Sequence, residues 1–241
     1  MMLISSQRRA LSIGPVRGVR SVVQRALIAV DVDGTLYDGV GVAAEAVDAL
    51  RLAHHDGHTL VIVTGRRWEE LGHVVPGIMG CVDRVVCEEG GVLVNVQSGE
   101  VTLLAEEVEP ELVAALRAAG VPNIDVGRVV VGAPTTSLAL VTEVRDAVGS
   151  TRRIVTNKGS IALAPLGCDK ASGLRAAIVD LGLQHLPILA IGDAANDLPM
   201  FAIATIAIAV ANADDAVRAS GVRLTKASFG SGVAEALREL H

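Results

Sequence analysis

From Ala26 onward, short runs of apolar residues alternate along the chain with segments whose apolar residues recur at helical spacing. The apolar runs predict buried strands at residues 27–30, 59–63, 84–87, 128–131, 152–156, 160–164, 188–191, 205–210 and 222–224, with a hairpin over 91–104. The helical spacing predicts helices at residues 43–53, 68–74, 109–119, 138–148, 170–181, 196–203, 214–219 and 232–240. Strands that alternate with helices predict an α/β fold with a doubly wound, Rossmann-like parallel sheet.

The alternation changes character in the middle of the chain. Between about residues 104 and 163 it predicts two helices, one strand and a strand pair across the turn Asn157-Lys158-Gly159, which suits a small α+β subdomain. The parallel pattern returns after Pro165. We therefore expect a core formed by residues 26–103 and 164–241, a cap subdomain at 104–163, and a flexible basic leader at 1–25.

Composition narrows the possible functions. The chain has 241 residues, 51% of them hydrophobic, but its aromatic residues are only Tyr37, Trp68, Phe201 and Phe229. So few aromatic side chains argue against a stacking surface for single-stranded nucleic acid or RNA. The net charge is −6, although the first 25 residues carry five arginines and no acid, so the rest of the chain is strongly acidic. We expect no nucleic-acid partner.

Membrane and redox signals are also weak. The longest largely apolar run, residues 200–211, is shorter than the roughly 20 residues that a membrane-spanning helix needs, so we expect no membrane partner. The three cysteines lack CxxC spacing, which fits buried thiols in a reducing cytoplasm. The leader has no continuous apolar segment and therefore does not resemble a secretory signal.

Polar residues follow the predicted strands. They are Asp31 and Asp33 after the first strand, Thr64, Gly65 and Arg66 after the second, and Asp193, Asn196 and Asp197 after the strand at 188–191, with Lys170 at the start of a helix. In a parallel sheet these positions meet at one edge, where ligands bind.

This set of side chains indicates phosphoryl chemistry. Several carboxylates close together repel one another unless a cation neutralises them, and an all-oxygen set suits Mg²⁺. A lysine and a hydroxyl beside the metal would hold phosphate oxygens. One aspartate could attack phosphorus and form an aspartyl-phosphate, while a second could act as general acid and base.

The motifs DVDGTL (31–36), VTGR (63–66), Lys170 and GDAAND (192–197), in that order, resemble those of the haloacid dehalogenase-like phosphohydrolases. The form GDxxND, the insert between the second and third motifs, and the closing segments NADDAV and GSGVAEAL are similar to the Cof-like branch with a type-two cap. That branch includes sugar-phosphate phosphatases, phosphomannomutases and archaeal-type phosphoglycolate phosphatases.

The resemblance implies a role for each residue. Asp31 would be the nucleophile and a Mg²⁺ ligand, and Asp33 the general acid and base, with its backbone carbonyl also on the metal. Thr64 and the Gly65 amide would hold the transferring phosphoryl group, while Lys170 would bridge Asp31 and phosphate. Asp193 would ligate Mg²⁺, and Asn196 and Asp197 would complete the site by contacting metal or substrate or by orienting Lys170. Arg66 and Lys158 are further candidates for substrate contact.

One position departs from the resemblance. The branch usually has Glu-Asn-Gly where this chain has Glu88-Glu89-Gly90, so an acid stands in place of the amide. The sequence therefore predicts a Mg²⁺-dependent phosphatase for a small phosphorylated metabolite, phosphoglycolate or a sugar phosphate, acting as a monomer or homodimer. Two alternatives stay open, a phosphomutase of the same superfamily and a non-catalytic phospho-acceptor or ligand-sensing module.

Overall fold

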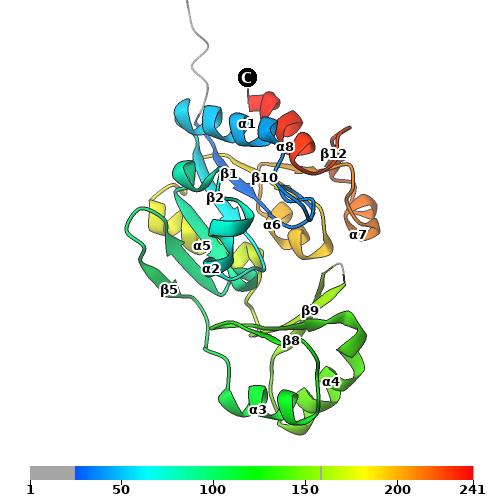
Figure 1. The fold of residues 1–241 in the computed structure, drawn as a ribbon. Helices are drawn as coiled ribbons and strands as arrows, with labels where there is room; N and C mark the ends of the chain where they lie inside the picture. Colours follow the sequence, from blue (N-terminus) through cyan, green and yellow to red (C-terminus); the bar gives the residue numbers. More distant parts are fainter. Residues whose placement is uncertain (1–24, 158, 241) are drawn as a thin grey trace, which may run out of the picture.

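The computed structural model describes residues 25–157 and 159–240, which form a large α/β core and a smaller cap (Figure 1). The predicted leader, apart from Arg25, and Lys158 lie outside the described residues. Among the helices that the structure describes, none is both long enough and apolar enough to cross a membrane.

The core is built on a sheet of eight strands in the order β12-β11-β10-β1-β2-β3-β4-β5. The bounds are β1 Leu27–Val30, β2 Thr59–Val63, β3 Arg84–Cys87, β4 Val92–Asn95, β5 Val101–Leu103, β10 Ile188–Gly192, β11 Ile206–Ala209 and β12 Arg223–Leu224. The pairings from β12 to β3 are parallel, whereas β3–β4 and β4–β5 are antiparallel. The predicted fold class is confirmed.

Helices cover both faces of this sheet. Successive apolar side chains of the central strand β1 point to opposite faces, so both faces must be covered to bury them. Ile28 and Val30 of β1 face one hydrophobic cluster, which includes Leu50 of α1 and Val233 of α8. Leu27 and Ala29 face the other, which includes residues of α5 and α6. The core helices are α1 Ala44–His55, α2 Trp68–Val74, α5 Lys170–Leu181, α6 Leu198–Ala202, α7 Asp215–Ala219 and α8 Phe229–Leu237.

The cap is a second layered unit, drawn in green in Figure 1. Its antiparallel sheet has the order β6-β7-β9-β8, with bounds β6 Asp125–Val126, β7 Val131–Pro134, β8 Arg153–Asn157 and β9 Ser160–Ala164. The helices α3 Pro110–Ala118 and α4 Leu138–Ala147 pack on it around a core of their own that includes Leu116, Val141 and Leu163.

Most predicted elements are confirmed within a few residues, and the exceptions have physical causes. A strand predicted at 128–131 begins instead at Val131, because the amides of residues 128–130 donate to the buried Glu88 carboxylate at 2.7–3.1 Å. The short strand β6 was not predicted. The helix predicted at 196–203 divides into a 3-10 turn, Ala195–Asp197, and α6, which has Pro199 in its first turn. The last helix begins at Phe229, earlier than expected.

Side chains also fasten the cap to its connecting segments. The guanidinium of Arg152, whose side chain is 3% exposed, pairs with Glu109 at 2.5 Å and donates to the carbonyls of Glu107 and Val129. Glu88 holds the 128–130 segment from the core side. The cap is therefore anchored at its base by buried charged groups whose hydrogen bonds are largely made to backbone.

Candidate active site

Three neighbouring parallel strands deliver the central acidic and hydroxyl side chains. Asp31 follows β1, Thr64 follows β2 and Asp193 follows β10, and these strands are adjacent in the sheet. Because they run in the same direction, their carboxyl ends share one edge. Lys170 enters this edge as the first residue of α5, whose N-terminus is capped by the Asp169 carboxylate accepting from the Ser172 amide at 2.8 Å.

Lys170 links two of the acids. Its Nζ atom donates to Asp31 Oδ1 at 2.6 Å and to Asp197 Oδ1 at 2.7 Å, and its side chain is only 1% exposed. Burial by itself would lower the pKa of Lys170, but the surrounding carboxylates outweigh burial and raise it. For Asp31, burial is the largest effect and raises the pKa well above its ordinary value, with Lys170 opposing it. The lysine is therefore held as a cation between two buried carboxyl groups.

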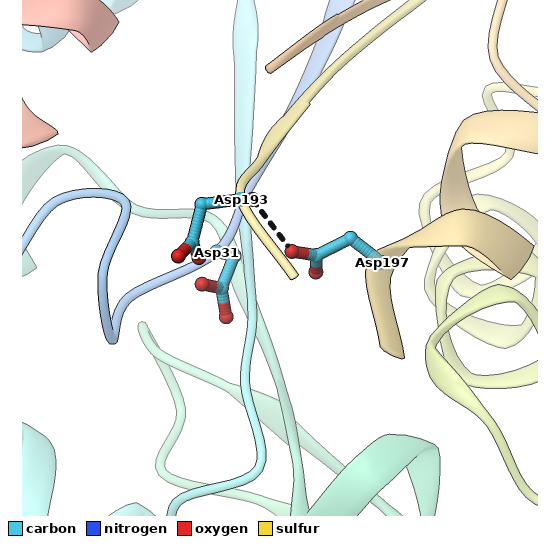
Figure 2. A group of neighbouring side chains, drawn as sticks. All are labelled: Asp31, Asp193 and Asp197. Carbon is cyan, nitrogen blue, oxygen red and sulfur yellow. Dashed lines mark hydrogen bonds between the residues drawn. The ribbon is translucent and has the colours of Figure 1, made fainter. Parts of the chain in front are cut away.

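Three buried carboxylates form a group that could hold a metal ion. Oxygen atoms of Asp31, Asp193 and Asp197 all lie within 4.8 Å of one another. Figure 2 shows the carboxylates of Asp31 and Asp193 next to each other, with Asp197 reaching the backbone of Asp193 through a hydrogen bond. This buried oxygen donor set fits Mg²⁺ by its chemistry.

The three acids are not equivalent. Both oxygens of Asp197 already accept hydrogen bonds, Oδ1 from Lys170 and Oδ2 from the amides of Asp193 and Ala194 at 2.8 and 3.0 Å. Asp197 is therefore placed to orient Lys170 and the 193–194 backbone, whereas Asp31 and Asp193 are better placed to contact a metal. The side chain of Asp33 lies outside this group of three.

Asp33 instead pairs with Arg66. The guanidinium donates from Nε to Asp33 Oδ2 and from Nη2 to Oδ1, both at 2.7 Å. The same guanidinium lies 5.5 Å from the centre of the Tyr37 ring, and the Asp33 side chain remains 40% exposed. Arg66 therefore forms an ion pair with Asp33, the residue predicted to be the general acid and base.

Thr64 and Gly65 form the turn after β2. Thr64 is fully buried, its amide donates to the Val86 carbonyl at 2.8 Å, and its hydroxyl accepts from the Arg66 amide at 3.1 Å. A Cβ atom on Gly65 would collide with the Glu89 carboxylate, so any larger residue there would have to displace that carboxylate. Gly65 lines the pocket together with Asp31.

Glu89, the residue that departs from the resemblance, is buried and lines this pocket. Both of its carboxylate oxygens accept from Asn196 Nδ2, at 3.1 and 3.2 Å, and Asn196 is itself buried. Desolvation is the largest influence on Glu89 and raises its pKa. The side-chain amide nitrogen of Asn196 is therefore directed at the Glu89 carboxylate.

The pocket of about 660 Å³ lies between core and cap. Its core side includes Asp31, Asp33 and Arg66, and its cap side includes Asn123, Asp125, Asn157 and Ser160. An ion pair crosses between the two units, from Arg67 Nη2 to Asp125 Oδ1 at 3.1 Å. The candidate substrate contact Lys158 lies outside the described residues.

Two positioning residues were not singled out from the sequence. Thr35 donates from its hydroxyl to Asp193 Oδ1 at 2.9 Å, and its place inside the DVDGTL motif was an available signal. Asn212 donates to the Gly34 carbonyl at 2.7 Å and accepts from the Phe229 amide at 2.8 Å, which ties the loop after β1 to the start of α8. Asn212 is the first residue of the NADDAV segment, but its partners in the fold could not be read from that segment.

The model of one protein family, described as haloacid dehalogenase-like hydrolase, matches residues 28–120 and 122–237. The chain belongs to this family. The prediction of an enzyme of the haloacid dehalogenase-like type is confirmed.

Named relatives and solved structures agree with this membership. A phosphoglycolate phosphatase from Methanothermobacter thermautotrophicus is 33% identical over 221 residues, which cover 88% of this chain and 96% of that protein. A haloacid dehalogenase-like hydrolase from Bacteroides thetaiotaomicron has the same fold, with a TM-score of 0.74 at 21% identity, covering 90% of this chain and 100% of the other. A subclass IIB sugar phosphatase also matches, with a TM-score of 0.70 at 19% identity over 89% of this chain and 98% of its own.

Proposed function

We propose that this hydrolase is a Mg²⁺-dependent phosphomonoesterase that works through an aspartyl-phosphate on Asp31. The observation that carries the proposal is the buried arrangement of Asp31 beside Asp193 and Lys170, with Asp33 two residues further on. A nucleophilic carboxylate, a fixed cation and a nearby exposed carboxyl are what phosphoryl transfer to an aspartate requires.

Each residue has a part in the two steps. A carboxylate oxygen of Asp31 attacks phosphorus, and the bond from phosphorus to the leaving oxygen breaks. Asp33, protonated once one of its oxygens is released from Arg66, gives its proton to that leaving alkoxide. In the second step, Asp33 takes a proton from water as the water oxygen attacks phosphorus, which releases phosphate and restores Asp31. The Thr64 hydroxyl and the Gly65 amide hold the phosphoryl group, and Lys170 offsets the charge between Asp31 and the anionic substrate.

Asp31 and Asp193 would hold Mg²⁺, together with the backbone carbonyl of Asp33. The ion, when bound, supplies charge neutralisation for the transferring phosphoryl group. Asp197 keeps Lys170 and the Asp193 backbone in place through the hydrogen bonds described above.

For the substrate we propose a small phosphorylated metabolite, with phosphoglycolate tested first and sugar phosphates second. The relative from Methanothermobacter thermautotrophicus, similar over almost its whole length, is named a phosphoglycolate phosphatase. The cap lies across the pocket from Asp31, so its residues would contact the leaving group and exclude water during transfer.

The test measures phosphate release from phosphoglycolate, a panel of sugar phosphates and para-nitrophenyl phosphate with Mg²⁺ present. Wild type should release phosphate, and Asp31→Asn should abolish release while keeping the fold. Undiminished turnover by Asp31→Asn would rule out the aspartyl-phosphate mechanism. An isomerised sugar phosphate without free phosphate would indicate a mutase, and a stable phospho-Asp31 without turnover would indicate a phospho-acceptor.

A further inference from the structure

Glu89 places an additional negative charge in a pocket that is already acidic. Its carboxylate is buried, lies against Gly65 and shares the pocket with Asp31. Among the described residues, no salt bridge reaches Glu89. The ammonium of Lys170 donates its hydrogen bonds to Asp31 and Asp197, so it acts on Glu89 only through space, as Arg153 does. Among the described residues, the Glu89 carboxylate accepts side-chain hydrogen bonds from Asn196 alone.

The backbone at this position is unusual for its residue type. Glu89 has φ +55° and ψ +26°, the left-handed region that glycine and asparagine adopt more readily than glutamate. Its own amide donates to the Thr64 carbonyl at 3.3 Å, so the strained residue is tied to the turn that carries Gly65. Strain of this kind persists where the surrounding structure holds it, and it occurs often at functional sites.

Glu89 also fixes the orientation of Asn196. Since both carboxylate oxygens accept from Nδ2, the Oδ1 atom of Asn196 points elsewhere. That oxygen is buried and has no hydrogen-bond partner among the described residues. A buried oxygen without a partner is costly unless something bound supplies a donor or a positive charge.

We propose that Glu89 is a positioning residue that biases this site toward the divalent cation and against the phosphate product. Its charge attracts the cation held by Asp31 and Asp193, and by engaging the Asn196 amide nitrogen it leaves the buried Asn196 oxygen as an acceptor. The same charge, packed against Gly65, repels the phosphate that leaves the Gly65 amide, and so favours release of product. This inference rests on the proposed function for the identity of the anion.

The experiment measures two affinities in wild type, Glu89→Gln and Glu89→Asn. Mg²⁺ binding is measured by calorimetry on metal-free protein without substrate, and inorganic phosphate binding is measured at saturating Mg²⁺. Glutamine preserves size and one acceptor for Asn196, and asparagine suits the left-handed backbone, so both variants should fold. Asp38→Asn is the matched control, because Asp38 lines the same pocket but is exposed, and asparagine can still accept from the Val40 and Gly41 amides.

We expect both Glu89 variants to bind Mg²⁺ about tenfold more weakly and phosphate about fivefold more tightly, since one buried charge acts on the two ions in opposite directions. Asp38→Asn should change either constant by less than about twofold, because exposed charges are screened. A purely structural role would weaken both affinities, and unchanged or parallel shifts would overturn the inference. If wild type binds Mg²⁺ and phosphate but hydrolyses no phosphomonoester, the proposed function fails. The opposite changes in Mg²⁺ and phosphate affinity in the Glu89 variants would still test the role of Glu89.

Discussion

Arg66 and Asp33 form a two-pronged ion pair, with both carboxylate oxygens of Asp33 held at 2.7 Å by Nε and Nη2 of the same guanidinium. This geometry fixes the direction of the Asp33 carboxyl, whose side chain is 40% exposed. The ion pair therefore determines the position of the Asp33 carboxyl, the proposed general acid and base, before substrate binds.

Replacing Arg66 by lysine tests this relationship. A lysine ammonium cannot hold two carboxylate oxygens in one plane, so we expect kcat to fall about tenfold. Steady-state kinetics on Asp33→Asn and on the double variant provide the comparison. If Arg66 acts through Asp33, the Arg66→Lys change should have much less effect in the Asp33→Asn background; an equal tenfold loss there would show that Arg66 acts independently.

Lys170→Met removes the ammonium between Asp31 and Asp197. Because buried carboxylates are then left without their cation, we expect the free energy of unfolding of metal-free protein to fall by about 3–5 kcal/mol. Phosphate release should fall by more than about 100-fold. Urea denaturation in EDTA provides the measurement, and the double variant Lys170→Met/Asp197→Asn should recover part of the loss. A change below about 1 kcal/mol would mean that the lysine does not neutralise these acids.

The stability of metal-free protein should depend on pH through Asp31. Burial raises the pKa of Asp31, so the folded protein keeps this proton to a higher pH than the unfolded chain, in which the pKa is about 3.9. Folding thus takes up a proton, and the free energy of unfolding should decrease as pH rises above about 4, by at most about 1.4 kcal/mol per pH unit for one group.

The measurement compares wild type and Asp31→Asn by urea denaturation in EDTA from pH 5 to pH 8. The variant should lose less stability than wild type as pH rises, because it has no proton to release at residue 31. Saturating Mg²⁺ should stabilise wild type increasingly with pH, since the ion binds the ionised carboxylate. Parallel curves for the two proteins would contradict a raised pKa at Asp31.

Gly90→Ala tests the contact that holds α5 in place. Gly90 has φ +100°, and a Cβ atom there would collide with the backbone carbonyl of Asp169, next to Lys170. We expect a loss of at least about 3 kcal/mol in the free energy of unfolding, from backbone strain together with the collision. Gly99→Ala is the matched control, because Gly99 also has a positive φ, +72°, but nothing lies within 4 Å. Gly99→Ala should lower the free energy of unfolding by about 1 kcal/mol. Similar losses in both variants would show that the collision with Asp169 does not contribute.

The sequence by itself determined the strands and helices of the core and the residues that stand at their ends. Runs such as Leu27–Val30 are apolar because they are buried on both faces, and this local pattern needs no knowledge of the fold. Once a parallel sheet is inferred, the shared edge follows from strand direction. The motif residues Asp31, Thr64 and Asp193 could therefore be assigned to one site in advance.

Only the tertiary structure decided how those residues interact. The strand expected at 128–131 began late because its amides donate to Glu88, some 40 residues away along the chain. The pairing of Arg66 with Asp33, of Glu89 with Asn196, and of Asn212 with Gly34 likewise joins distant segments. Local periodicity reports which positions are buried, whereas the partner of a buried polar group depends on which segments the fold brings within hydrogen-bond distance.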